Sequence, residues 1–361
     1  MAAKFRILSL VTAMLALLAC SSCSDSSTEL LVETENATSI LNLRIKLARS
    51  TYSSRAPGDE RPANDGERMK TLRIIILNGN SQAEYNQLWN LDAPAVDDFV
   101  TRVRVRSNEQ KTIILVANKA GVTITDSSGN KHDASTYFGN INANLGTFVD
   151  VGELRKLTMV LDDNKDGNGW LRTPLVINDI YTMTIGEKPE YTRNFWIERA
   201  ASKYTFRITN NDARNSHTLT SLTIGRVASA QFFFPNADYS DDAHTTRTSY
   251  STPAGVTTKD VVLNINREIP AGGTIEVGPF YVPEGLVFDD AYKIGLAIDG
   301  DEFEHRNIVW HAPNESATQL MTDLPRNTHV VSNITLNYVN WSVDYTVCPW
   351  DTHTINIPEF N

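Results

Sequence analysis

The chain has 361 residues and a formal net charge of −10, with 43 Asp and Glu against 33 Lys and Arg. Such an acidic chain without a basic cluster argues against nucleic acid and anionic membrane surfaces as partners. Of its cysteines, Cys20 and Cys23 lie near the N-terminus and only Cys348 lies in the body. The body therefore has no disulfide framework, and a hydrophobic core must hold its fold together.

The N-terminus has the three parts of a secretory signal peptide over residues 1–19. A cationic start with Lys4 and Arg6 precedes the apolar run Ile7–Ala19, which is shorter than the roughly 20 residues of a membrane-spanning helix. Leu-Leu-Ala before Cys20 is similar to the bacterial lipobox. We expect Cys20 to carry a lipid that holds the precursor at the outer membrane, with Cys23 as the second candidate.

The first strand predicted after the leader is Leu41–Leu47. Leu41, Leu43, Ile45 and Leu47 alternate with polar residues, which indicates a strand with one buried face. The short segments Gln82–Trp89 and Glu153–Lys156 contain residues that favour helices and are expected to be helical. A hairpin is predicted from Leu154–Leu161 and Trp170–Ile177 around the turn Asp162–Gly169. The other predicted strands are Leu72–Leu77, Lys111–Val116, Tyr204–Thr209, Leu219–Ile224, Gln231–Phe234, Val261–Ile265, Thr274–Tyr281, Lys293–Ile298, Asn307–Trp310, His329–Leu336, Trp341–Val347 and His353–Ile357.

Many strands separated by Gly, Pro, Asn and Asp turns predict an all-β protein, mainly β with a few short helices. We expect two tandem β-sandwich domains with Greek-key wiring. The polar segment Gly186–Glu190 lies between apolar strands and is the best boundary. The predicted division is a propeptide at 20–55, an N-terminal domain at 56–190 and a C-terminal domain at 191–361.

Motifs of catalysis and metal binding are missing or incomplete. Asp162–Gly167 begins like a calcium-binding loop, but the twelfth position is Thr173 instead of the required Glu. His305 and His311 are expected to be scattered surface residues. Cys20-Ser-Ser-Cys23 has CxxC spacing but lies at the predicted lipidation site, and no second cysteine pair exists to complete a zinc site. The sequence has no HExxH or Gly-x-Ser-x-Gly motif and no phosphate-binding Gly loop. We therefore predict no enzyme activity, no metal site and no cofactor.

The polar segment Ala48–Gly66 follows the first strand and is a favourable place for proteolysis. A trypsin-like protease cuts after Arg unless Pro follows, which excludes Arg61. Of Arg49 and Arg55, the second lies among Ser, Pro and Gly, where the backbone should be most exposed. Cleavage between Arg55 and Ala56 would release the first strand; an ordinary flexible linker is the alternative.

At this loop the chain resembles the fimbrillin family, the type V pilins of Gram-negative anaerobic bacteria. The family has a lipoprotein leader, a strand, a loop with Asn/Ser-Arg-Ala and a strand that ends in Asn-Gly, and further motifs follow in the same order. His329 stands near the place of a family Tyr, which leaves the subunit class open. The matching segments are Ser53–Ala56, Leu72–Gly79, Ile114–Asn118, Arg199–Ile208, Phe280–Glu284, Leu324–His329 and Val347–Trp350.

The resemblance implies a fimbrillin-type, transthyretin-like sandwich fold and a mechanism of assembly. An Arg-specific, trypsin-like protease removes the strand at about Ser39–Leu47, which leaves a groove of unpaired backbone groups. The C-terminal strands of a neighbouring subunit, about Trp341–Ile357, then fill the groove by strand addition. A head-to-tail contact that does not close makes a filament. The donor residues that replace Leu41, Leu43, Ile45 and Leu47 are Trp341, Val343, Tyr345 and Val347.

The leading functional hypothesis is therefore a structural subunit of a surface fimbrium that polymerises with itself or other pilins and supports cell adhesion. The alternatives are a lipid-anchored, glycan-binding surface protein of two β-sandwiches, and an uncleaved anchor or tip pilin. For Trp341–Ile357, a permanent edge strand is the alternative to donation.

Overall fold

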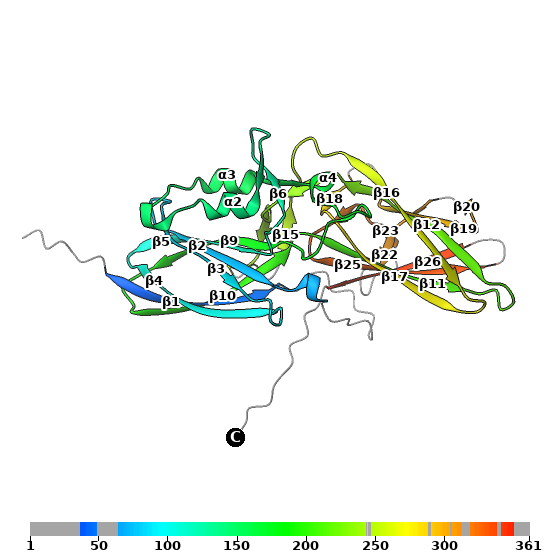
Figure 1. Ribbon diagram of the computed structural model, residues 1–361, viewed down its shortest axis with the longest axis horizontal. Coiled ribbons are helices and arrows are strands. Elements are labelled where there is room, and N and C mark those ends of the chain that lie inside the picture. The colour runs from blue at the N-terminus through cyan, green and yellow to red at the C-terminus, as the bar shows by residue number, and fades with distance from the viewer. Residues whose placement is uncertain are drawn as a thin grey trace, which may run out of the picture. The chain divides into compact units, whose positions relative to one another are not determined.

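The computed structural model describes residues 37–48, 64–242, 244, 247–287, 290–303, 305–311, 318–337 and 341–349 (Figure 1). The predicted lipidation residues Cys20 and Cys23, the predicted cut between Arg55 and Ala56, and the predicted strand His353–Ile357 lie outside these residues. Within the described part of the chain, no helix is long and apolar enough to cross a membrane.

A seven-stranded sheet has the order β3-β2-β5-β9-β10-β1-β4. β9 and β10 pair only where Ile177 and Asn178 face Arg199 and Glu198, so the sheet divides into two layers there. Its strands are β1 (Thr38–Leu47), β2 (Thr71–Leu77), β3 (Ala83–Asn90), β4 (Asp98–Arg106), β5 (Glu109–Ala117), β9 (Ile177–Ile185) and β10 (Glu190–Arg199).

The side chains of the two layers meet in one apolar cluster, which makes this part of the chain a β-sandwich. Alternation along β2 explains how one strand serves two cores. Ile74 and Ile76 belong to the cluster between the layers, whereas Ile75 and Leu77 point to the opposite face.

Short helices cover that opposite face of β2, β5 and β9 (Figure 1). The side chains of Asp133 and Asp150 cap α2 (Ala134–Gly139) and α3 (Val151–Lys156), accepting hydrogen bonds from backbone N–H groups of their first turns. Phe138 and Leu154 then bury against the sheet. The same region contains β6 (Thr123–Thr125), β7 (Lys131–Asp133), η2 (Ala143–Leu145), β8 (Thr158–Val160), α4 (Leu161–Asn164) and β13 (Ala230–Phe232). The short helix η1 (Asp65–Glu67) lies instead beside Arg199 and Tyr281.

Two further sheets, β17-β11-β25-β26 and β16-β12-β19-β20 with β21 beside β19, contribute to one core. This core is continuous with the residues under the helices. The strands of these two sheets are β11 (Ser202–Asn210), β12 (His217–Ala228), β16 (Thr258–Ile269), β17 (Thr274–Val282), β19 (Lys293–Ile298), β20 (Asp301–Glu302), β21 (Arg306–Asn307), β25 (Thr328–Leu336) and β26 (Trp341–Pro349). Two-stranded sheets are formed by β14 (Ala237–Tyr239) with β15 (Arg247–Tyr250), β18 (Gly285–Leu286) with β24 (Asp323–Leu324), and β22 (Val309–His311) with β23 (Thr318–Leu320).

The structure is mainly β with short helices, so the predicted fold class is confirmed. Glu190 begins β10, a strand of the seven-stranded sheet, and the division into domains near residue 190 stays a prediction.

Two local predictions are wrong. The segment Gln82–Trp89, expected to be helical, is mostly β3, because pairing with β2 lets Tyr85 and Trp89 pack on the sandwich core. The hairpin of Leu154–Leu161 and Trp170–Ile177 does not form. Its first arm begins inside α3 and continues into β8, and most of its second arm is irregular.

Candidate functional site

β1 is the middle strand of the layer β10-β1-β4. It runs parallel to β10, from Ile40 opposite Glu190 to Leu47 opposite Ile197. It runs antiparallel to β4, from Thr38 opposite Arg106 to Lys46 opposite Asp98. The first predicted strand is therefore paired along both edges by strands that come later in the chain.

The inward side chains of β1 are fully enclosed. Leu41, Leu43 and Ile45 are 0% exposed and Leu47 is 1% exposed. Burial of each such side chain contributes about 1.5–3 kcal/mol. Removal of β1 would leave four apolar pockets and two facing rows of unpaired N–H and C=O groups, which is an unstable surface. This space between β4 and β10 is called the β1 groove below.

Both ends of the loop segment 49–63 are attached to the body of the protein. At the end of β1, the Ala48 N–H donates to the Ile197 carbonyl at 2.8 Å. The Ala48 carbonyl accepts from Asn327 Nδ2, also at 2.8 Å. On the other side of the loop, Asn64 Nδ2 donates to the Tyr281 hydroxyl at 2.9 Å. The segment with the predicted cut thus begins and ends at fixed points.

Asn327 and Tyr281, which hold the two ends of the loop, belong to one cluster of buried polar residues. Its members are Glu67, Arg199, Lys203, Tyr281 and Asn327, and it is called the junction cluster. Glu67 is fully buried; its carboxylate accepts from the Tyr281 hydroxyl at 2.7 Å and pairs with Lys203 Nζ at 2.8 Å. Arg199 donates from Nε to the Glu67 carbonyl and from Nη1 to Asn327 Oδ1. The cluster fastens the end of β1 to strands from the far part of the chain.

Burial lowers the pKa of Arg199 to about 10, against the opposing effect of Glu67, so the guanidinium stays charged at neutral pH. Three segments of the fimbrillin resemblance supply members of the junction cluster: Arg199, Tyr281 and Asn327. The sequence placed these motifs in order, but only the fold shows that they meet at the end of β1.

Glu284 and Arg326, from two of the same motifs, form a second buried ion pair, with Arg326 Nη2 at 2.5 Å from Glu284 Oε1. Arg326 also donates to the carbonyls of Phe232 and Phe233. Burial alone would raise the pKa of Glu284, but Arg326 and Arg247 outweigh it and hold the pKa below its usual value. The stabilisation is therefore present above the unfolded-state pKa and is lost as the pH falls through the folded-state pKa.

Replacement of Glu284 by Gln is expected to lower the free energy of unfolding by about 3–5 kcal/mol, because Arg326 stays buried without a countercharge. Urea denaturation followed by circular dichroism measures this loss. Asp290→Asn is the matched control, since Asp290 pairs with Arg226 and Lys293 at the surface. It should change stability far less, and an equal effect of both variants would contradict the prediction.

The outer face beside the β1 groove is basic, although the chain as a whole is acidic. Val103 and Val105 point to the core, so Arg102, Arg104 and Arg106 of β4 point outward and are exposed. Arg44 of β1 is exposed on the same face. Arg102 pairs with Glu190 at 3.4 Å, whereas Arg104 and Arg106 form no ion pair with any described residue. These four arginines are called the basic rim.

The predicted donor strand lies in a different sheet from β1. β26 pairs with β25 along its full length, from Trp341 opposite Leu336 to Pro349 opposite Thr328, and is the last strand of its sheet among the described residues. Tyr345 is 6% exposed and belongs to the core of its own subunit. The second arm of the predicted donor, up to Ile357, lies outside the described residues.

No protein-family model and no curated protein matches the chain. Among solved structures, the tip fimbrial protein Mfa3 from Porphyromonas gingivalis, in a form with a C-terminal truncation, matches with a TM-score of 0.55 at 12% identity, over 87% of this chain and 100% of that one. The chain has a fimbrillin-type fold. This confirms the fold that the sequence motifs predict.

Two further solved structures match the chain with lower TM-scores. The fimbrilin FimA from Porphyromonas gingivalis matches with a TM-score of 0.49 at 16% identity, over 87% of this chain and 98% of that one. A fimbrial assembly protein from Parabacteroides distasonis matches with a TM-score of 0.42 at 10% identity, over 86% of this chain and 98% of that one.

The residues that only looked like a metal site have ordinary partners within this fold. Asp162 pairs with Lys165 at 2.8 Å and with Lys259 at 2.6 Å, and Asp163 pairs with Lys131 at 2.7 Å. The described residues contain no group of three or more His, Cys, Asp or Glu placed to hold a metal ion.

Proposed function

We propose that this protein is a structural subunit of a surface fimbrium, exported as a lipoprotein precursor, cut after Arg55 and polymerised by donor-strand exchange. The observation that carries the proposal is the position of β1, an inner strand that is fully paired and immediately precedes the predicted cleavage loop. A cut there leaves Asn64 attached to the body through Tyr281. The cut would break the covalent link between β1 and the body of the subunit, while the groove that holds β1 stays intact.

Alternation in a strand supports Trp341–Val347 as the occupant of the emptied groove. Trp341, Val343, Tyr345 and Val347 repeat with the same period of two as the four buried residues of β1. A strand from a second copy would restore hydrogen bonds to β4 and β10, while its alternate side chains enter the four pockets.

Charge on the outer face supports the same exchange. Arg44 of β1 lies opposite Val100 and diagonally across from Arg102 of β4, whereas Lys46 lies opposite Asp98. Like charges on neighbouring strands, such as Arg44 and Arg102, are destabilising. In the donor segment the alternate positions are Ser342, Asp344 and Thr346. Asp344 in the place of Arg44 would therefore replace a like charge beside Arg102 by an opposite one.

The experiment that tests the proposal is N-terminal sequencing and electrophoresis of protein extracted from the cell surface. We expect a chain that begins at Ala56 and runs as a ladder of polymers that heat converts to monomer. A monomeric chain that begins at Cys20 and retains its lipid would overturn polymerisation and would fit an uncleaved anchor or tip subunit.

A further inference from the structure

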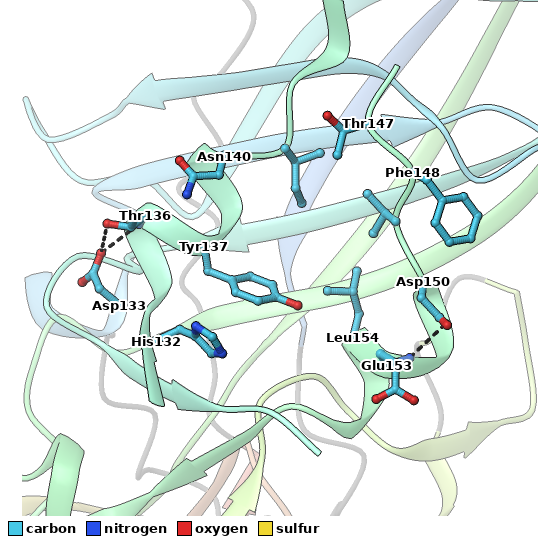
Figure 2. A pocket seen from close by; sticks show the side chains of 12 residues that line it. His132, Asp133, Thr136, Tyr137, Asn140, Thr147, Phe148, Asp150, Glu153 and Leu154 are labelled. Carbon is cyan, nitrogen blue, oxygen red and sulfur yellow. Dashed lines mark hydrogen bonds between the residues drawn. The ribbon is translucent and has the colours of Figure 1, made fainter. Parts of the chain in front are cut away.

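A cavity of about 480 Å³ opens beside the helices on the outer side of the first sandwich. It lies between α2 and α3, and its lining includes His132, Tyr137, Asn140, Phe148, Asp150 and Glu153. Figure 2 shows the Tyr137 ring in the middle of the cavity, with Phe148 and Asp150 on one side and Asp133 and Asn140 on the other. The volume is in the range of small-molecule sites.

The aromatic part of the lining is unusually open for apolar side chains. Phe148 is 66% exposed, although it belongs to a segment that is fixed by a hydrogen bond from Val149 N–H to the Ser81 carbonyl at 2.8 Å. The Tyr137 ring is held from behind by His132 and Phe138, each with ring centroids 5.3 Å away. An exposed aromatic group beside a supported one is a feature of a binding surface.

The polar part offers both donors and acceptors. Among the described residues, the Tyr137 hydroxyl and the Asn140 side-chain amide have no hydrogen-bond partner. Asp133 and Asp150 accept backbone N–H groups of α2 and α3 with Oδ1, which leaves further acceptor capacity on each carboxylate. Donors and acceptors beside an aromatic surface match a sugar ring, which has hydroxyl groups at its edge and C–H groups on its face.

The charge of the lining residues determines which class of sugar the cavity favours. Asp133, Asp150 and Glu153 line the cavity, and its lining residues include no Lys or Arg. Glu153 pairs with Lys156 at 2.7 Å, whereas Asp133 and Asp150 form no ion pair with any described residue. Carboxylates would repel the acidic groups of sialylated or sulfated glycans. A Lys or Arg side chain would satisfy the carboxylates but would leave the donors of Asn140 and Tyr137 unused. The chemistry therefore favours a neutral saccharide over both anionic glycans and cationic peptides.

We propose that this cavity binds a terminal neutral sugar of a glycan, with one ring face against Phe148 and Tyr137 and its hydroxyls on Asn140, Asp133 and Asp150. This site lies apart from the β1 groove, on the helical side of the sheet. The proposal goes beyond strand exchange and does not depend on it.

The test is isothermal titration calorimetry and saturation-transfer NMR on the purified full-length chain. The probes are methyl glycosides of glucose, galactose and mannose, N-acetylglucosamine, N-acetylneuraminic acid and Nα-acetyl-lysine methylamide. We expect at least one neutral sugar to bind with a Kd on the order of 1 mM, about −4 kcal/mol, and the two charged probes not to bind. Because the assay needs only the monomer, it is independent of cleavage and polymerisation.

Variants locate the site. Phe148→Ala and Asn140→Ala should each weaken binding of that sugar at least 10-fold. Leu145→Ala is the matched control, because Leu145 is 80% exposed at the end of the neighbouring η2 and does not line the cavity. It should leave the affinity unchanged. The proposal is overturned if no neutral sugar binds, if Phe148→Ala and Leu145→Ala bind alike, or if Nα-acetyl-lysine methylamide binds in preference.

Discussion

Replacement of Arg55 by Ala is expected to abolish polymers at the cell surface and to leave the precursor with β1 in place. The strand is held by pairing along both edges and by four enclosed aliphatic side chains. While Ala48 remains joined through the loop to Asn64, any exchange must displace a strand that returns intramolecularly at high effective concentration. Immunoblots of boiled and unboiled surface extracts measure the loss of the ladder.

Arg61→Ala is the control, because Pro62 follows it and blocks a trypsin-like cut. This variant should be processed and should polymerise like the unchanged protein. A normal ladder from Arg55→Ala would contradict the assignment of the cut to Arg55. If polymers then disappear only when Arg49 and Arg55 are both replaced, the result would support the release of β1 and would show that the protease can cut after Arg49.

The period of two in Leu41–Leu47 was sufficient to predict the buried face of β1, and all four predicted inward residues are enclosed. Periodicity reports one strand at a time, however. It could not show that β1 lies between β4 and β10, or that its pairing with β10 is parallel, because both depend on contacts far apart in the sequence. These long-range contacts are the ones on which the proposed exchange of β1 depends.

The two wrong local predictions have a common cause. Leu154, Leu157 and Leu161 are spaced by three and four, and the helical part of this spacing is too short to be distinguished from a strand by pattern alone. In β3, pairing with β2 overrides the local preference of a segment that contains Glu, Gln and Leu. Short elements take their structure from the surfaces that they cover.

The junction cluster was also beyond sequence analysis, although its residues lie in the motifs that carry the fimbrillin resemblance. Arg199, Tyr281 and Asn327 come from three separate segments, and their roles depend on contacts with Glu67 and the Ala48 carbonyl. Release of β1, as proposed, would take the Ala48 carbonyl from Asn327 Nδ2 and leave Arg199 on Asn327 Oδ1. Under that proposal, Arg199 would hold Asn327 at the end of the groove both before and after cleavage.

A synthetic peptide of residues Trp341–Ile357 is expected to block polymerisation of cleaved subunits by occupying the β1 groove. The peptide avoids disturbing β26, which completes the sheet of its own subunit and buries Tyr345. A peptide with Val343→Asp and Tyr345→Asp should need a concentration at least about 100-fold higher for the same inhibition, because each buried carboxylate without a partner costs about 1–3 kcal/mol or more. Inhibition by both peptides alike would exclude the groove as the binding site.

The outer face of the groove gives a second, finer test with the same peptide. Asp344→Lys should weaken inhibition by about fivefold, which corresponds to roughly 1 kcal/mol for an exposed pair, because Lys would meet the basic rim. Position 344 would take the place of Arg44, diagonally across from Arg102. Subunits with Arg102→Glu should therefore restore inhibition by the Lys peptide and weaken inhibition by the unchanged one. Such a reversal can arise only if the donor lies beside β4 with Asp344 outward, so its absence would contradict the register proposed for exchange.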